Sequence, residues 1–345
     1  MSRKTIAILA ILAICMTVAA GVALTLDRGA RLDPRIGTPV FPALTERAND
    51  VAAITVESNL GKLSLDRGAS GWTLQESDNY PVLAVKANGA VLDLASLRFH
   101  EAKTKRPEKY GKLNLRDFNA PGSGSSRVTV RAKDGTMLAD VTVGNGKFNL
   151  PGTKAGGVYI RLPGDSQTWL AQGGVGFSGV ASDWLEPKVF HIDGAQIKRV
   201  AIQHQNGKPV VVTKRNAKTL AYTLEGVPPG FKIKYAEEPK LIATNLEDFE
   251  LEDARAAGAI PFPAANKIRT TFETFSGMQI TAETTKQGGK NWVRFSIAPV
   301  PRSSDTAAAK ARELSDRTKG WVYRIADYRA ARFTKTIAEL IEPIR

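Results

Sequence analysis

A glycine-rich pattern is the first feature of this sequence that could serve chemistry. Gly174, Gly176 and Gly179 spell GxGxxG after an expected strand, and Asp193 lies where a ribose-binding acid would be expected. A dinucleotide site needs a helix that starts at these glycines, because its N-terminal amides hold the pyrophosphate. Pro187 would interrupt such a helix after eight residues. The pattern therefore favours a flexible turn, and we expect no cofactor.

Metal and covalent chemistry lack candidates as well. His100, His191 and His204 form none of the close pairs that metal sites commonly use, so we expect no metal site. The one cysteine, Cys15, lies in an apolar stretch, and the sequence has no GxSxG elbow or serine–lysine motif. We therefore predict no catalytic residue and a protein that is not an enzyme.

A run of acids could be a cation site or a carboxylate pair for sugar chemistry. Leu246, Phe249 and Leu251 occupy the apolar positions of an expected helix in this run. The acids then fill the solvated face of that helix, and they are Glu247, Asp248, Glu250, Glu252 and Asp253.

The net charge of +14 points to an anionic partner, because basic chains attract nucleic acid, acidic polymers and anionic membranes. One basic cluster stands out as a candidate surface, and its members are Lys103, Lys105, Arg106, Lys109 and Lys112. No nucleic-acid module with interleaved aromatic residues accompanies it, so we expect no nucleic-acid partner. Anionic lipid headgroups or acidic envelope polymers fit the cluster, and dispersed solubilising charge is the alternative.

The N-terminal segment must set where these side chains work. Ile6 to Leu26 is 21 residues without a charge, which at about 1.5 Å per residue crosses a hydrocarbon core of about 30 Å. We expect a transmembrane anchor over residues 1–28, and a signal peptide cut after Ala20 is the alternative. Lipidation of Cys15 is excluded because the bulky Ile14 precedes it. A short basic N-terminus before the apolar run places the bulk of the chain in the periplasm.

The remaining chain reads as α+β. Residues 29–48 are rich in Pro, Gly and Arg and predict a tether. Short strands then form a meander up to Leu74, a helical pattern covers 82–102, and further strands separated by hairpin turns follow up to Leu170.

An internal repeat is the strongest pattern. The spacing of Val51, Ile54, Val56 and Gly61 recurs as Ile197, Val200, Ile202 and Gly207. Trp72 matches Tyr222, and Leu94 to Ala102 matches Leu246 to Ala254. We therefore predict duplicated subdomains of antiparallel meander plus helix, over residues 49–190, 191–265 and, more weakly, 266–345.

The order of these features resembles a known family. The strands from Val51 to Leu74, the Pro107–Leu113 stretch, Val158–Asp165 and Asp183–Leu185 are similar to bacterial membrane-anchored envelope proteins catalogued as domain of unknown function 4340. Members of that family are typically encoded beside a permease, an ATP-binding subunit and a protein of gliding-motility-type ABC transporters. The resemblance implies an accessory role and carries no catalytic residues.

The sequence thus predicts a single-pass protein of the inner membrane, with its bulk in the periplasm. Its expected role is a non-enzymatic scaffolding or binding subunit of an envelope ABC-type transport complex, whose partners would be the permease and the gliding-type subunit. Two alternatives remain open: an envelope glycan or lipid hydrolase, and a membrane-surface protein that binds anionic lipid.

Overall fold

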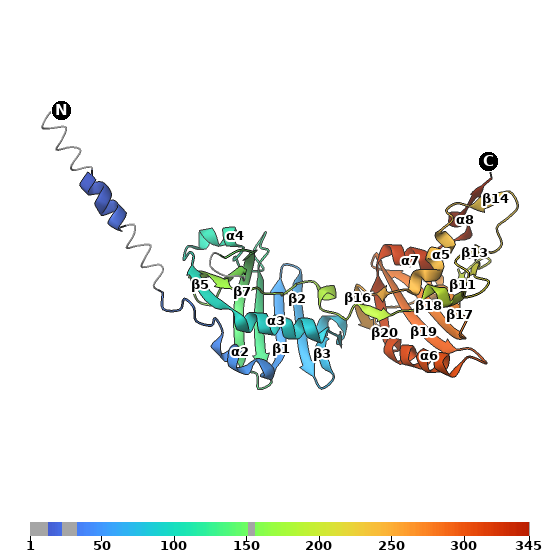
Figure 1. The fold of residues 1–345 in the computed structure, drawn as a ribbon, viewed down its shortest axis with the longest axis horizontal. Helices are drawn as coiled ribbons and strands as arrows, with labels where there is room; N and C mark the ends of the chain where they lie inside the picture. Colours follow the sequence, from blue (N-terminus) through green and yellow to red (C-terminus); the bar gives the residue numbers. More distant parts are fainter. Residues whose placement is uncertain (1–12, 23–32, 151–155, 345) are drawn as a thin grey trace, which may run out of the picture. The chain divides into compact units, whose positions relative to one another are not determined.

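A computed structural model of the chain describes residues 13–22, 33–150 and 156–344. The chain divides into two compact units (Figure 1). The first unit comprises Met1–Thr73 and Val82–Val180, and the second comprises Leu74–Pro81 and Ala181–Arg345. Both consist mainly of antiparallel sheet with several helices, so the chain is α+β, as the sequence predicts.

The N-terminal segment is described only in part. Residues 13–22 are helical, and Ile14, Met16, Val18 and Val22 within them are exposed. Within the described part of the chain, no helix is long and apolar enough to cross a membrane. Most of the expected anchor at residues 1–28 lies outside the described residues, so the anchor stays a prediction.

The first unit is a sheet with two helices packed on it. The strands that belong to this unit lie in the order β3-β2-β1-β6-β7-β8-β9-β5, and the pairs from β2 to β5 are antiparallel. The elements are α2 (Pro42–Arg47), β1 (Val51–Ser58), β2 (Gly61–Gly68), β3 (Gly71–Leu74), α3 (Ala84–Ser96), β5 (Arg98–Ala102), η3 (Pro107–Lys109), α4 (Tyr110–Leu113), β6 (Ser126–Ala132), β7 (Met137–Lys147), β8 (Gly157–Arg161) and β9 (Thr168–Gln172).

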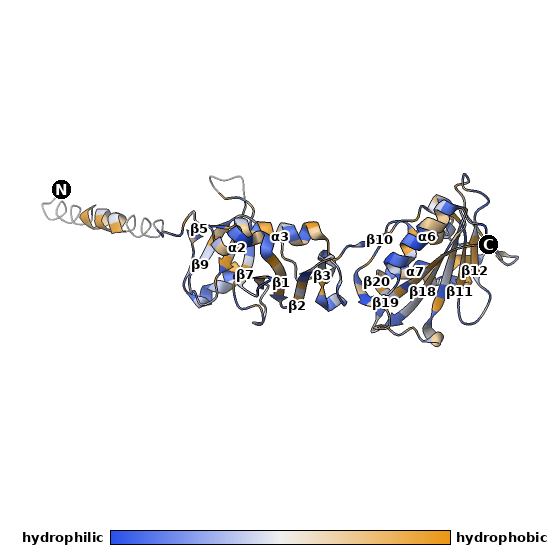
Figure 2. Cartoon of the chain, turned by 90° about the horizontal axis from the view of Figure 1, so that it is seen from below, coloured by the Kyte–Doolittle hydropathy of each residue, from blue (hydrophilic) through white to orange (hydrophobic). Residues whose placement is uncertain are grey.

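Alternation along the strands selects the face that is buried. In β1 the side chains of Ile54 and Val56 are fully buried, whereas Thr55 and Glu57 between them are partly exposed. Helix α3 buries Ala87, Ala90, Val91 and Leu94, a spacing that forms one apolar stripe. Figure 2 shows this mixing of hydrophobic and hydrophilic residues along the strands.

The expected tether differs from the structure over residues 33–48. The amide of Val40 donates to the carbonyl of Leu97 (2.8 Å), and Phe99 donates to Thr38 (3.1 Å). Val40, Phe41 and Leu44 are buried. The Pro, Gly and Arg content suggested a tether, but these apolar side chains gain burial against the first unit, where α2 contacts α3 and β7, so this segment folds with that unit.

The second unit has a larger set of elements. They are η2 (Gln75–Ser77), β4 (Tyr80–Pro81), β10 (Lys188–Phe190), β11 (Ile197–Gln203), β12 (Val210–Thr213), β13 (Thr223–Leu224), β14 (Phe231–Ile233), α5 (Glu238–Ala243), η6 (Thr244–Leu246), β15 (Phe249–Glu250), β16 (Asp253–Ala256), β17 (Ile268–Thr274), β18 (Met278–Gln287), β19 (Lys290–Pro299), α6 (Asp305–Thr318), β20 (Trp321–Ile325), α7 (Asp327–Thr334), α8 (Ile337–Leu340) and β21 (Ile341–Pro343).

An aromatic cluster fills the core of the second unit. Phe249 stacks on Phe190 with 5.2 Å between ring centroids, and Phe295 of β19 meets Phe249 edge-on at 5.0 Å. Phe333 of α7 closes the cluster against Phe272 of β17 at 6.0 Å. Edge-to-face pairs of this kind add stability beyond the area they bury.

The two sheets share one strand order. The main sheet of the second unit runs β13-β12-β11-β17-β18-β19-β20-β16, which repeats the order of the first unit strand for strand. The register of β1 on β6 shifts between Val51 and Ala53, and that of β11 on β17 shifts between Ile197 and Arg199. The repeated pattern found in the sequence therefore marks equivalent strands, including an equivalent irregularity.

The expected boundaries within the second half differ from this arrangement. Residues 191–265 and 266–345 were expected as two repeats, yet both supply strands to one sheet, in which β16 pairs with β20. The strands from Ile268 onward belong to the same sheet as the strands before them, because β17 pairs directly with β11. Residues 181–190, expected within the first repeat, also belong to the second unit.

The helix expected around the acids at 247–253 is wrong. This stretch contains the short strands β15 and β16, and Asp248 has a φ of +40°, which ends helical continuation. Phe249 and Leu251 are buried, and Asp253 is buried too. The helix of this region lies earlier, at α5 and η6.

Candidate functional site

The basic cluster lies on one continuous segment that follows β5. Lys105, Arg106, Lys109 and Lys112 are exposed, on the loop, on η3 and on α4. Lys103 behaves differently, because its Nζ lies 2.6 Å from the carboxylate of Glu101 and its side chain is mostly covered. Four of the five expected cations therefore form an exposed surface, which we call the basic segment (Lys105–Lys112).

The base of this segment is fixed by strand β9. Thr104 accepts from the amide of Thr168 at 2.9 Å, and its own amide donates to the Thr168 hydroxyl at 3.0 Å. Tyr110 is buried, its hydroxyl donates to the carbonyl of Ser166 at 2.6 Å, and Arg161 lies over its ring. The exposed cations are thus carried by a backbone that the sheet holds in place.

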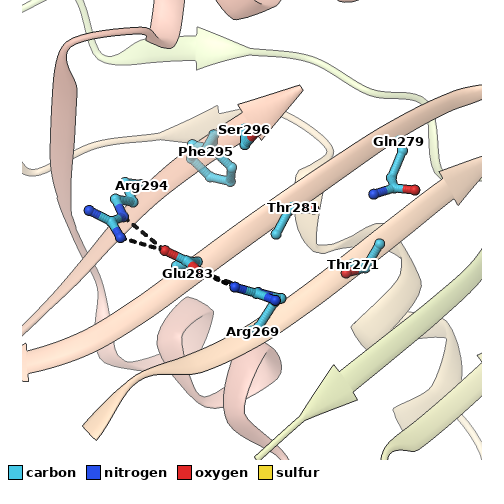
Figure 3. Close-up of a pocket in the computed structure, with 8 residues that line it drawn as sticks. All are labelled: Arg269, Thr271, Gln279, Thr281, Glu283, Arg294, Phe295 and Ser296. Atoms are coloured by element: carbon cyan, nitrogen blue, oxygen red, sulfur yellow. Dashed lines mark hydrogen bonds and ion pairs between the residues drawn. The ribbon is translucent and has the colours of Figure 1, made fainter. Parts of the chain in front are cut away.

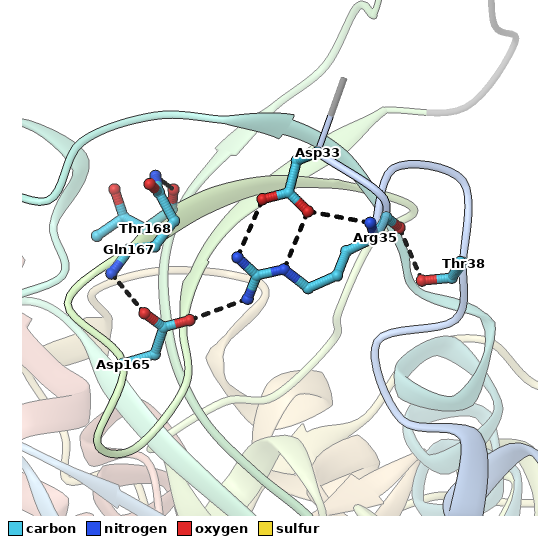
Figure 4. A network of polar contacts seen from close by, with 6 residues as sticks. All are labelled: Asp33, Arg35, Thr38, Asp165, Gln167 and Thr168. Carbon is cyan, nitrogen blue, oxygen red and sulfur yellow. Dashed lines mark hydrogen bonds and ion pairs between the residues drawn. The ribbon is translucent and has the colours of Figure 1, made fainter. Parts of the chain in front are cut away.

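An arginine network beside this segment was not found from the sequence (Figure 4). The guanidinium of Arg35 donates through Nε and Nη2 to both oxygens of Asp33, each at 3.1 Å. Its Nη1 donates to Asp165 at 3.1 Å, and the group lies 4.4 Å from the ring centroid of Trp169. Charge-assisted pairs and a cation–π contact together dock residues 33–38 on the sheet.

The docked residues 33–38 lie beside the loop that begins the basic segment, because Arg35 contacts Asp165 and Trp169 and the neighbouring Thr168 holds Thr104. The hydrogen bond from Arg35 lowers the pKa of Asp33, and the positive charge of Lys105 lowers it further. Lys105 follows Thr104, which strand β9 holds, and therefore lies in the neighbourhood of Asp33, the first residue described after position 22. No pattern in the sequence indicated this neighbourhood, because the two side chains lie 72 positions apart in the chain.

The glycine pattern does not open a helix. Residues 174–178 have no regular structure, and the only helical turn that follows closely is the short η4 (Ala181–Asp183). Asp193 accepts from the amide of Ala195 at 2.7 Å and so caps the turn η5 (Gly194–Gln196). The glycine pattern therefore lies in an irregular segment that starts no long helix, as the position of Pro187 suggested, and Asp193 caps a local turn.

The histidines lie apart from one another. His191 accepts from the amide of Asp248 at 3.3 Å, and His204 lies 3.1 Å from the carbonyl of Lys335, whereas His100 lies in β5 of the first unit. Among the residues that the structure describes, no three His, Cys, Asp or Glu side chains converge as metal ligands would.

The acids at 247–253 serve separate local contacts. Glu247 accepts from the amide of Gly194 at 2.7 Å, and Asp248 pairs with Lys188. Asp253 is 5% exposed and accepts from the hydroxyl of Ser77 at 2.9 Å and from Arg255 at 2.8 Å. These acids hold loops and strand ends in place and do not converge on one point.

Fold and surface together define the class of the protein. It is an α+β chain of two sheet units, with an exposed basic segment beside residues 33–38. A family model described as "Domain of unknown function (DUF4340)" matches residues 72–269, which is more than half of the chain. The chain belongs to this family, as the sequence resemblance indicated. Comparison with curated proteins and with solved structures gave no match.

Proposed function

We propose that this chain is a single-pass inner-membrane protein that acts as a non-enzymatic accessory subunit of an envelope ABC-type transport complex. Its two sheet units would be duplicated subdomains that present binding surfaces in the periplasm. Family membership supports the association with permease and ATP-binding subunits that the resemblance implies. The role rests on that analogy together with the geometry of the first unit.

The position of the basic segment carries the proposal. Asp33 lies seven positions after Leu26, at the end of the apolar run, and this stretch of chain spans at most about 25 Å at full extension. An anchored chain therefore holds Asp33 close to the lipid surface, and with it Lys105, because Arg35 contacts Asp165 and Trp169 and the neighbouring Thr168 holds Thr104. Each Lys or Arg near an anionic leaflet contributes about 1 kcal/mol to attraction. We infer that the basic segment faces the headgroups and orients the first unit.

Purification of the tagged full-length chain from its native membranes in mild detergent tests the transport role. The expected result is co-purification of a multispanning permease and an ATP-binding subunit, identified by mass spectrometry. Recovery of the intact chain without either subunit, under conditions in which a known ABC complex from the same membranes stays assembled, would contradict the proposal.

Binding of anionic lipid is the second candidate function, and the exposed cations at 105–112 favour it. A chain beginning at Asp33 retains the contacts described above for both units. We expect it to sediment with vesicles that contain anionic lipid, and less so as salt rises, because salt screens surface charge. Glutamine at all four cations (K105Q, R106Q, K109Q and K112Q) should weaken binding by roughly a hundredfold or more.

A matched variant separates location from net charge. Lys208, Lys286, Lys290 and Arg302 are also exposed, and they lie in the second unit. Their replacement by glutamine removes the same charge but should leave most of the vesicle binding. Equal loss in the two variants would show that dispersed charge, and not the basic segment, attracts the vesicles.

A further inference from the structure

A polar groove lies on the outer face of the main sheet of the second unit (Figure 3). It holds about 550 Å³ and crosses strands β17, β18 and β19. Phe295 directs its ring to the aromatic core on the opposite face. The remaining lining residues are polar or charged, and they are Arg269, Thr271, Gln279, Thr281, Glu283, Arg294 and Ser296.

Three cations surround one carboxylate in this groove. Arg294 donates to Oε2 of Glu283 through Nε (2.9 Å) and Nη2 (2.6 Å). Arg269 donates through Nη2 to Oε1 at 2.9 Å, and the Nζ of Lys267 lies 3.1 Å from the same oxygen. The carboxylate neutralises one of the three positive charges, so two remain in excess at the groove.

Both guanidinium groups keep donors for a ligand. Each uses its Nε and Nη2 edge on Glu283, and the Nη1 groups make no hydrogen bond with the residues that the structure describes. The side chains of Arg269 and Arg294 are 55% and 45% exposed, whereas that of Glu283 is 13% exposed. Arg294 also lies 4.6 Å from the ring centroid of Phe262, which restrains it further.

Glu283 is the common hydrogen-bond acceptor between the two arginines. Its burial by itself raises the pKa of the carboxyl group, but hydrogen bonds from Arg294, Arg269 and Lys267 outweigh this effect and lower the pKa to about 2. The group stays ionised at any physiological pH. The arginines are therefore held in place before a ligand arrives, which reduces the entropy that binding would cost.

Neutral hydrogen-bonding groups continue the groove along the strands. Thr271, Thr281 and Ser296 lie opposite one another on adjacent strands, two residues along each strand from Arg269, Glu283 and Arg294. Gln279 of β18 follows on the next position of the same face. Hydroxyl and amide groups both donate and accept, and thus suit the hydroxyl groups of a sugar.

We propose that this groove binds an anionic saccharide, with a phosphate or carboxylate group on Arg269 and Arg294 and with sugar hydroxyls on the neighbouring Thr, Ser and Gln side chains. Arginine forks match phosphate and carboxylate geometry, and the groove has the size of ordinary small-molecule sites. The inference concerns the second unit alone and does not depend on the proposed transport role.

Calorimetric titration of the full-length chain, in a detergent without a sugar headgroup, tests the inference. The probes are glucose 6-phosphate, glucuronate, glucose and inorganic phosphate. Glucose 6-phosphate and glucuronate should bind, and glucose should bind far more weakly. Arg269→Gln and Arg294→Gln should each weaken binding of the anionic sugars by roughly tenfold or more.

Arg199→Gln is the matched control. Arg199 lies on a neighbouring strand, pairs with Glu273 at 3.1 Å and does not line the groove, so its loss should leave affinity unchanged. Thr281→Val keeps the charges and the shape of the side chain, and it should weaken only the sugar probes.

Three results would overturn the inference. They are no heat of binding for either anionic sugar to a folded chain, inorganic phosphate binding as tightly as glucose 6-phosphate, and equal weakening by Arg199→Gln. The first outcome would leave a structural ion network only, and the second would remove the assignment to a saccharide.

Discussion

The outer faces of the two sheets place arginines at the same positions but neutralise them differently. In the first unit Glu57, Arg127, Thr142 and Arg161 lie opposite one another across β1, β6, β7 and β8. The equivalent set across β11, β17, β18 and β19 is Gln203, Arg269, Glu283 and Arg294. Two arginines thus flank the β7 position in one unit and the β18 position in the other.

The two faces differ in how many carboxylates pair with their arginines. In the first unit Arg127 forms a two-pronged pair with Asp140 (2.9 and 2.7 Å), and Arg161 pairs with Asp117, so each arginine has its own carboxylate. In the second unit both arginines share Glu283. One shared strand order can therefore carry arginines that each have a carboxylate of their own or arginines that share one, which leaves excess positive charge.

The largest expected loss of stability comes from truncating a core side chain, and it should differ between the two units. Phe272 is buried in the core of the second unit at the position that Val130 occupies in the first. Val130 pairs with Ile54 of β1, and Phe272 pairs with the equivalent Val200 of β11. Phe272→Ala should lower the free energy of unfolding by about 3–5 kcal/mol, because it leaves a cavity in the aromatic cluster. Val130→Ala removes less volume and should cost less, as measured by urea denaturation.

The exposed neighbour Thr271 provides the control for this pair. Thr271→Ala should change the unfolding midpoint little, because the side chain lies on the outer face. Equal destabilisation by Phe272→Ala and Thr271→Ala would contradict the assignment of the two faces.

The next effect concerns the shared carboxylate. Glu283→Gln removes the negative charge beneath three cations and should cost about 1–3 kcal/mol of stability. Asp140→Asn breaks a single pair and should cost less. Thermal denaturation of the two variants beside the parent chain measures both losses of stability. A larger loss for Asp140→Asn than for Glu283→Gln would contradict this expectation.

Acid pH should reduce the stability that the shared carboxylate of Glu283 contributes. The pKa of Glu283 lies at about 2 in the folded chain, below its ordinary value of 4.5. A depressed pKa means that the unfolded chain binds protons first, so the stability from Glu283 is full above pH about 4.5 and is lost as pH falls toward 2. Thermal denaturation between pH 5 and 2 should show this loss, reduced in Glu283→Gln; an identical pH profile in that variant would contradict it.

The smallest effect is that of the one-to-one pair. Arg127→Gln should change the free energy of unfolding by less than about 1 kcal/mol, because Arg127 is 41% exposed and pairs with one acid. It should leave the binding of glucose 6-phosphate unchanged, unlike Arg269→Gln at the equivalent position. A change in sugar affinity on Arg127→Gln, measured by titration, would show that the two faces do not differ as described.

Local patterns in the sequence predicted much of the fold. The spacing shared by Val51 and Ile197 marks equivalent strands because buried positions recur with the strand period. The pattern misled where neighbours in space are distant in sequence: β16 finds its partner in β20, and a reader of the sequence alone takes the intervening strands for a new repeat. Likewise, the spacing of Leu246 and Phe249 imitates a helix because both are buried.

The sites were harder to predict than the fold. The basic segment is contiguous, so composition revealed it. The Glu283 cluster draws on residues 14 and 11 positions away, and only the strand register brings them together. The docking of Arg35 on Trp169 depends on a contact across more than a hundred residues, for which a single sequence offers no signal.

We propose that the first unit meets the membrane with its basic segment. This proposal is tested most directly by spin labels on the full-length chain in nanodiscs of anionic lipid, with Cys15 replaced by Ser. One label replaces Glu108, which lies within the segment but is not basic; the other replaces Ser70 in the β2–β3 turn, on the far side of the sheet from β5. Six strand spacings, about 29 Å, separate β2 from β5.

Paramagnetic relaxation from a metal chelated by lipid headgroups then reports proximity. We expect strong relaxation of the label at position 108 and little at position 70. Equal relaxation at both positions, or stronger relaxation at position 70, would contradict the proposal.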